Sequence, residues 1–416
     1  MRGRAFMTFD LVLAGARIGR RAGLVDIGIK HGQILAIEAE LTSDAPREEA
    51  CGCFVFGGFV DSHIHLDKAC ILDRCIICEG TLHEAVRESA RAKAAFTVED
   101  VYARAARVIE AAILHGTMAL RTFVEIDPRA GFRSFEAIMA IKRDYAWAID
   151  VQVCAFAQEG TTQEPQTLAM LAQALRHGAD LIGGCPYTDP DPAAHIRDIF
   201  DLAEQHAVAI DFHLDFDLDP SGSNLPCVIA ETRRRGYDGR VSIGHATKLS
   251  AMAPDDVRTI AGELAEAGIG VTVLPATDLF LLGRGHDRLV PRGIAPALLL
   301  SRAGVTTSAA TNNILNPFTP FGDASLVRMA NLLANTAHLS RDDDILAVFA
   351  MVSEAAGSLI GHPQGLDVGK AADIVLLDAA DPVSVVREIR PAVAGWKRGR
   401  KTFSRPRPTL HRPEPL

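Results

Sequence analysis

Two histidines stand two residues apart at the end of an apolar run, in the segment Phe59-Val-Asp-Ser-His63-Ile-His65-Leu-Asp-Lys68. On a β-strand, residues i and i+2 point to the same side, so His63 and His65 can bind one metal ion together. Two such histidines are also common as polar groups on a wetted face, and the motif alone favours this simpler interpretation. The rest of the sequence has to decide between the two.

The middle of the chain alternates strand-like and helical segments. The predicted strands are Phe54–His65, Met118–Ile126, Val151–Gln158, Leu181–Pro186, Ala209–Asp215, Val241–Thr247, Gly270–Pro275 and Val305–Asn312. The predicted helices between them include Glu99–Leu114, Thr167–His177, Ala194–His206, Cys227–Arg235 and Asp255–Ala267. This alternation predicts an α/β fold, a (β/α)8 TIM barrel.

Polar residues fall repeatedly at the ends of these predicted strands. They are His63 and His65, Gln158, His213, His245 and Asn312. Active sites in this fold form at the C-terminal strand ends, so residues far apart in sequence meet around one point. Four histidines placed in this way therefore predict a metal site, which the first motif alone did not.

The two ends of the chain are both rich in short strands. Each is too small to bury a core alone, so we expect them to pair into one small β-sandwich domain. The predicted boundaries are 1–57 for the first part of the sandwich, 58–362 for the barrel, 363–405 for the second part and 406–416 for a tail.

Composition excludes several classes of function. Lys and Arg number 43 against 52 Asp and Glu, a formal charge of −9 that argues against a nucleic-acid partner. No run approaches the ~20 apolar residues of a membrane helix. The eight cysteines do not form a disulfide framework, and Cys75-Ile-Ile-Cys78 lacks a second pair at zinc-site spacing. We expect a cytoplasmic homo-oligomer that acts on a small molecule.

Several motifs resemble the amidohydrolase superfamily, and within it the cytosine deaminase and N-isopropylammelide amidohydrolase branch. They include the His63 motif already quoted, Ala155-Phe-Ala-Gln-Glu-Gly, Gly244-His-Ala-Thr, Asn316-Pro-Phe-Thr-Pro-Phe-Gly and the closing Gly365-Leu-Asp-Val-Gly-Lys-Ala-Ala-Asp-Ile-Val. The resemblance runs from about residue 9 to 400, and it implies the barrel and the returning β domain.

By position, the resemblance implies that His63, His65 and His213 bind one divalent metal ion, zinc or iron. His245 would polarise the substrate or help to activate water. The fourth strand, Leu181-Ile-Gly-Gly-Cys-Pro, has no lysine that could be carbamylated to bridge two metal ions, so one metal ion is expected.

The resemblance also implies residues that contact the substrate. Gln158 would hydrogen-bond the amide edge of a heterocycle, and Lys68 matches a lysine that lies beside the site in the ammelide enzyme. We expect Asn312 and Asn313 to contact the substrate as well.

Two departures from the family pattern concern proton transfer. The eighth strand normally ends in an aspartate that binds the metal and takes a proton from its water, but this chain has Thr311-Asn312-Asn313 there. An amide cannot act as a base near neutral pH. The cytosine deaminases also place a glutamate three residues after the fifth-strand histidine, where this chain has Phe216.

Asp215 and Asp217 are candidates for the missing base. If the strand continues past His213, both carboxylates share its face, and one can reach the metal water. The alternative is that these acids cap the loop before Pro220-Ser-Gly. His245 and an uncharged Lys68 are further candidate acceptors.

The leading hypothesis is a metal-dependent hydrolase of C–N bonds that deaminates a small nitrogen heterocycle, with cytosine as the first substrate guess. A metal ion lowers the pKa of bound water from about 15.7 to about 7, which supplies a nucleophile at neutral pH. The alternative is an amidohydrolase fold with redirected or lost chemistry, because both usual carboxylates are replaced.

Overall fold

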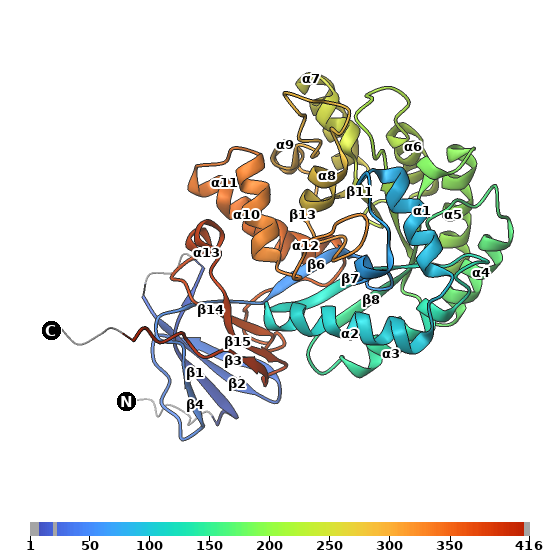
Figure 1. The fold of residues 1–416 in the computed structure, drawn as a ribbon. Coiled ribbons are helices and arrows are strands. Elements are labelled where there is room, and N and C mark those ends of the chain that lie inside the picture. The colour runs from blue at the N-terminus through green and yellow to red at the C-terminus, as the bar shows by residue number, and fades with distance from the viewer. Residues whose placement is uncertain (1–7, 20–22, 412–416) are drawn as a thin grey trace.

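The computed structural model describes residues 8–19 and 23–411. Within them the chain forms a barrel of strands and helices and a separate β domain built from both chain ends (Figure 1). The beginning of the first predicted β segment and the end of the predicted tail lie outside the described residues. Every helix in these ranges is too short or too polar to cross a membrane.

The barrel sheet contains eight parallel strands in sequence order, as predicted. They are β6 (Phe59–Ile64), β7 (Thr117–Glu125), β8 (Asp150–Ala157), β9 (Leu181–Gly184), β10 (Ala209–Leu214), β11 (Val241–His245), β12 (Gly270–Val273) and β13 (Thr307–Ala309). Most of their residues are buried, which fits strands that are covered by side chains on both faces.

Helices surround the barrel (Figure 1). They are α1 (Leu82–Lys93), α2 (Val98–Leu114), α3 (Arg133–Asp144), α4 (Gln166–Arg176), α5 (Pro192–His206), α6 (Leu225–Arg235), α7 (Pro254–Glu266), α8 (Pro275–Leu281), α9 (Ala297–Arg302), α10 (Leu326–Thr336), α11 (Asp342–Met351) and α12 (Glu354–Leu359). Short 3-10 turns lie at Leu72–Arg74, Pro186–Thr188 and Thr247–Ala251.

The first predicted strand, Phe54–His65, is in fact two strands. β5 (Phe54–Phe56) belongs to the terminal β domain, and β6 begins the barrel. Gly58 lies between them with φ +96°, and a Cβ atom there would lie 2.2 Å from Cγ of Met118. Any side chain at this position would cause both backbone strain and a clash, which explains why the residue between the two strands is glycine.

Asn312 closes the barrel although it lies beyond the end of β13. Its N–H donates to the carbonyl of His63 at 2.8 Å, and its carbonyl accepts the N–H of His65 at 2.8 Å. Deeper in the barrel the hydroxyls of Ser62 and Ser308 hydrogen-bond at 2.8 Å. These contacts join the last barrel segment to the first, and they position both histidines of the opening motif.

The terminal segments form a second sheet, as predicted. Its strands are β1 (Leu11–Ile18), β2 (Val25–Lys30), β3 (Gln33–Glu38), β4 (Arg47–Glu49), β5, β14 (Ile374–Leu377), β15 (Ala392–Lys397) and β16 (Arg400–Ser404), with α13 (Pro382–Glu388) after β14. β5 pairs with β1 on one side and with β14 on the other, so the two chain ends share one sheet.

Lys397 fastens this sheet to the barrel. Its ammonium contacts Asp373 beside β14 and Asp150 at the start of β8, both at 2.6 Å. The lysine side chain is 1% exposed. Removing a buried cation that lies between two carboxylates is costly, because both carboxylates then lose their partner of opposite charge.

Lys397→Met should therefore lower the free energy of unfolding by about 3 kcal/mol. Lys401→Met is the matched control, because Lys401 pairs with Glu48 at the surface and should cost less than about 1 kcal/mol. Denaturant unfolding measures both values. Equal effects of the two substitutions would contradict a joining role for Lys397.

Candidate active site

Three imidazoles meet inside the barrel at the C-terminal ends of two strands. His63 lies in β6, His65 directly follows it, and His213 lies in β10. The Nε2 atom of His213 lies 3.0 Å from that of His63 and 2.9 Å from that of His65. All three side chains are buried. The structure thus brings together the three residues that were predicted as metal ligands.

Hydrogen bonds among the rings do not account for this arrangement. A neutral imidazole carries one proton or one lone pair on Nε2, so His213 can serve only one of its two neighbours well. Among the described residues, Nδ1 of each ring also has no hydrogen-bond partner. Three converging lone pairs are the donor set that a divalent metal takes, and the residues fit one such ion.

Electrostatics keeps these rings in the form that binds metal. Burial first, and neighbouring cationic groups second, lower the pKa of all three imidazoles well below the usual 6.5. The rings are therefore neutral near pH 7, and their lone pairs are free for a metal ion.

Close packing fixes the rings. A Cβ atom on Gly244 would lie 2.6 Å from Cε1 of His63, so the glycine of the Gly244-His-Ala-Thr motif makes room for this ligand. The ring of Phe123 lies 4.1 Å from His63, and that of Phe156 lies 4.2 Å from His213, between ring centroids. The chain thus restrains two of the rings in the geometry that converges on one point.

Two buried aspartates support the backbone around the histidines. Asp61 accepts hydrogen bonds from the N–H and the hydroxyl of Thr311, and Asp67 accepts the N–H groups of Lys68 and Glu125. Burial raises the pKa of both carboxyls to about 6. These contacts are to backbone and hydroxyl groups, so both residues stabilise the ends of β6 and its neighbours.

His245 ends β11 and forms a pair with Asp278 of α8. The carboxylate Oδ1 of Asp278 lies 2.8 Å from Nδ1 of His245, and the aspartate side chain is wholly buried. Burial raises the pKa of Asp278, while the contact with His245 opposes this shift. A carboxylate that accepts the Nδ1 proton leaves the lone pair on Nε2, which makes His245 a proton acceptor.

Asp215 and Asp217 do not follow the expected alternation. The condition for a shared face with His213 was that the strand persists to Asp217, and it is not met, because β10 ends at Leu214 and Asp215 has φ +54°. The carboxylate of Asp215 accepts from Ser223 and from the N–H of Asn224, and that of Asp217 pairs with Lys248 at 2.8 Å. Both acids hold the loop after β10, as the alternative interpretation proposed.

Asn312 and Phe216 occupy the positions where the family pattern has carboxylates. Asn312 has φ +59°, a conformation that asparagine tolerates, and its buried Oδ1 has no hydrogen-bond partner among the described residues. Phe216 is buried with its ring centroid 4.3 Å from that of His245. The site therefore has an unpaired amide oxygen and an aromatic wall at these two positions.

Lys68 and Gln158 lie together near this centre. The Lys68 ammonium donates to Oε1 of Glu125 at 2.6 Å and to Oε1 of Gln158 at 3.2 Å, and it lies 4.6 Å above the ring of Phe318. Phe318 and Phe216 belong to one apolar cluster. The predicted substrate contacts Lys68 and Gln158 are thus held side by side.

Glu125 lies at the centre of a buried charge network. Its second oxygen accepts from Lys93 of α1 at 2.9 Å, and Lys93 also contacts Asp127 and Glu159. Burial raises the pKa of Glu125, but the ammonium groups of Lys68 and Lys93 outweigh it and lower this pKa to about 2. The two ammonium groups therefore favour the ionised form of Glu125.

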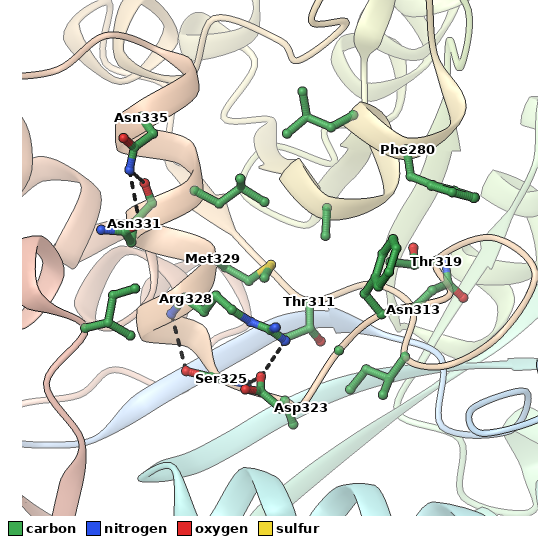
Figure 2. Close-up of a pocket in the computed structure, with 18 residues that line it drawn as sticks. Phe280, Thr311, Asn313, Thr319, Asp323, Ser325, Arg328, Met329, Asn331 and Asn335 are labelled. Carbon is green, nitrogen blue, oxygen red and sulfur yellow. Dashed lines mark hydrogen bonds and ion pairs between the residues drawn. The ribbon is translucent and has the colours of Figure 1, made fainter. Parts of the chain in front are cut away.

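Asn313 faces a different space. It lines a cavity of 540 Å³ between α8, α10 and the loop after β13, together with Thr311 (Figure 2). Its Oδ1 accepts a hydrogen bond from the amide of Asn316. The four histidines at the strand ends are not part of this lining. A substrate contact of Asn313 stays a prediction.

The comparisons with known proteins agree with this geometry. The sequence pattern of the amidohydrolase family matches residues 76–403. This chain belongs to the amidohydrolase family. It is 28% identical over 410 residues to N-isopropylammelide isopropyl amidohydrolase of Pseudomonas sp. (strain ADP), covering 94% of this chain and 96% of that protein.

Two other amidohydrolase relatives act on other rings. Pterin deaminase of Rhizobium rhizogenes is 29% identical over 332 residues, which cover 78% of this chain and 75% of that protein. The crystal structure of 5-methylcytosine deaminase from Klebsiella pneumoniae with 5-fluorocytosine superposes with a TM-score of 0.92 at 26% identity, and it covers 96% of this chain and 99% of that one.

The sequence did not single out Asp278 or Glu125. Glu125 ends β7, and a charged residue at the end of a buried strand is the same signal that marked Gln158. Asp278 lies inside a helix after β12, where no spacing distinguishes it from a surface residue. Only the fold of the following helix brings it to His245.

Replacing one imidazole should abolish tight metal binding. His213→Ala should weaken metal affinity by at least about 100-fold, since even residues that only orient ligands contribute about 10- to 100-fold. His177→Ala, at an exposed helix end, is the control and should change nothing. Metal content after dialysis against a graded chelator measures both. Equal retention of metal in the two variants would show that the triad is not the site.

Proposed function

We propose that this amidohydrolase hydrolyses a C–N bond of a small nitrogen heterocycle and releases ammonia or an amine, with one zinc or iron ion held by His63, His65 and His213. The convergence of three neutral imidazole nitrogens carries this proposal. The relatives support it, because their names describe the removal of amino groups from cytosine, pterin and ammelide rings. Cytosine-like deamination is the first candidate reaction.

A metal ion held by the triad would polarise water and the ring carbon that water attacks. The chain's own residues provide the proton transfer. His245, oriented by Asp278, takes the proton of the attacking water at Nε2 and returns it to the leaving nitrogen. Water thus supplies oxygen to the ring, the C–N bond breaks, and the nitrogen leaves protonated.

The surrounding side chains orient the ring. The ammonium of Lys68 and the amide of Gln158 provide polar contacts, while Phe216 and Phe318 provide apolar walls. The unpaired Oδ1 of Asn312 is a neutral acceptor for the metal or for a substrate N–H. The eight free cysteines support a reducing compartment such as the cytoplasm.

Metal analysis combined with assays of amine release tests this function. The purified protein should contain one metal per chain and release ammonia from at least one member of a panel of cytosine, isocytosine, pterins, creatinine and amino-triazines. A chelator should abolish the release, and zinc or iron should restore it. Protein that resists metal loading and releases nothing from the panel would refute the proposal.

Asn312→Asp separates a working site from one whose chemistry is redirected or lost. If asparagine belongs to a working site, the new carboxylate should lower turnover, because the buried Oδ1 position then carries a charge. A gain of deaminase activity would instead indicate a site that has lost its hydrolytic base. The same panel and a measurement of metal content distinguish the two outcomes.

Asp278→Asn should lower kcat by about 100-fold or more and leave metal content unchanged, because a neutral amide does not stabilise the protonated imidazole of His245 and can donate to Nδ1, which favours the wrong tautomer. Asp217→Asn is the matched control, since the Asp217 side chain is half exposed and pairs with Lys248. It should leave kcat within about twofold. A large loss in the control would return Asp217 to the list of proton acceptors.

A further inference from the structure

The polar contacts of Lys68 and Gln158 determine which ring edge they can recognise. A lysine ammonium only donates hydrogen bonds, so the Gln158 atom that faces it at 3.2 Å is the carbonyl oxygen Oε1. The amide nitrogen of Gln158 is then directed away from Lys68, and its contact among the described residues is the thiol of Cys185 at 3.6 Å. A thiol is a weak acceptor, so the amide keeps an N–H group for a ligand.

Lys68 keeps a donor as well. Among the described residues its ammonium has two hydrogen-bond acceptors, Glu125 and Gln158, for three N–H groups. The ring of Phe318 lies 4.6 Å from the ammonium and is a far weaker acceptor than a carbonyl oxygen, so the third N–H group stays available to a ligand. Lys68 and Gln158 thus present two hydrogen-bond donors beside each other. Without Lys68, the Gln158 amide would instead present one donor and one acceptor to a ligand.

Both residues lie close to the metal-binding imidazoles. Gln158 directly follows β8, and its amide contacts Cys185. Cys185 belongs to the same apolar cluster as Phe123 and Phe156, whose rings pack against His63 and His213. Lys68 is connected to His245 through aromatic contacts, since Phe318 shares a cluster with Phe216 and Phe216 packs on His245. Lys68 is also close enough to all three metal-binding imidazoles to contribute to their lowered pKa, so both donors lie near the metal ligands.

Glu125 makes this arrangement rigid. Its two oxygens bind Lys68 and Lys93, and its N–H donates to Asp67. The side chains of Glu125, Lys68 and Lys93 are each about 5 to 6% exposed. The Lys68 ammonium is already held by two acceptors, Glu125 and Gln158. The lysine side chain therefore loses little further rotamer freedom when a ligand binds, which favours selective binding.

We propose that Lys68 and Gln158 form a two-donor edge, positioned by Glu125, that selects ring substrates with two adjacent hydrogen-bond acceptors. The class comprises rings in which a carbonyl oxygen neighbours a ring nitrogen without a proton, either pyridine-like or deprotonated. A ring edge that alternates N–H and carbonyl fits less well, because its N–H meets a donor. This inference rests on the proposed function for its site, but not on turnover.

Binding of two matched rings to the metal-loaded protein tests the proposal. Uracil is neutral near pH 8, whereas its isostere 6-azauracil has lost a ring proton and presents a nitrogen lone pair beside a carbonyl. Calorimetry should give an affinity for 6-azauracil at least about tenfold higher than for uracil, the effect of one hydrogen bond to a charged group. Equal affinities, or tighter binding of uracil, would overturn the proposal.

Variants of Gln158 and Lys68 test whether the preference for 6-azauracil over uracil comes from this two-donor edge. Gln158→Glu, which replaces the amide donor by an acceptor of equal size, should abolish or reverse the preference, and Lys68→Met should reduce it toward equality. The surface substitutions Gln163→Glu and Lys142→Met are the matched controls and should preserve it. A preference that survives in both site variants would show that the metal, and not this edge, binds the anion.

Glu125→Gln tests the positioning role. It keeps Lys68 but removes its charged anchor, so the preference should fall while metal content stays at one per chain. Glu125→Asp should restore part of it. Amine release without the binding preference would refute this inference alone, and the preference without amine release would refute the proposed function alone.

Discussion

The closing of the barrel at Asn312 is the contact on which the candidate site depends. The backbone of this residue binds the carbonyl of His63 and the N–H of His65, one on each side of a single position. A shift of one residue in this pairing would turn both imidazoles to other directions, since side chains alternate along a strand. The left-handed conformation of Asn312 is part of the same closure. The residue in place of the family aspartate thus has a structural task that does not depend on its side-chain charge.

Burial divides the groups around the centre into two kinds. The imidazoles are buried close to other cationic groups, which keeps them neutral and suited to a metal ion. Lys68, Lys93 and Glu125 are equally buried, but each has a partner of opposite charge, and these contacts raise the pKa of Lys93 and lower that of Glu125. A buried charge is tolerated only when it is paired in this way. The site therefore combines a neutral metal-binding part with a rigid charged part that orients the ring.

The sequence predicted those features that follow from local periodicity. The eight strands, the pairing of the two chain ends and the meeting of His63, His65 and His213 all follow from alternation and from the rule that sites form at strand ends. Asp215 shows the limit of this reasoning, because the pattern of acids left open whether the strand persists to Asp217, and only the structure shows that Asp215 is left-handed and that β10 ends before it. Asp278 and Glu125 were missed because their partners, His245 and Lys68, are distant in sequence and only the fold joins them. Gln158 shows the same limit, because only the fold brings Lys68 to its carbonyl oxygen.

X-ray absorption at the metal edge of the reconstituted protein tests whether His63, His65 and His213 hold one metal ion. We expect one metal per chain, with ligand atoms of nitrogen and oxygen at about 2.0 to 2.2 Å that include three imidazoles. His213→Ala should remove one imidazole from this set of ligands. Sulfur ligands at about 2.3 Å, a second metal nearby, or an unchanged spectrum in the variant would show that these three histidines do not form a one-metal site.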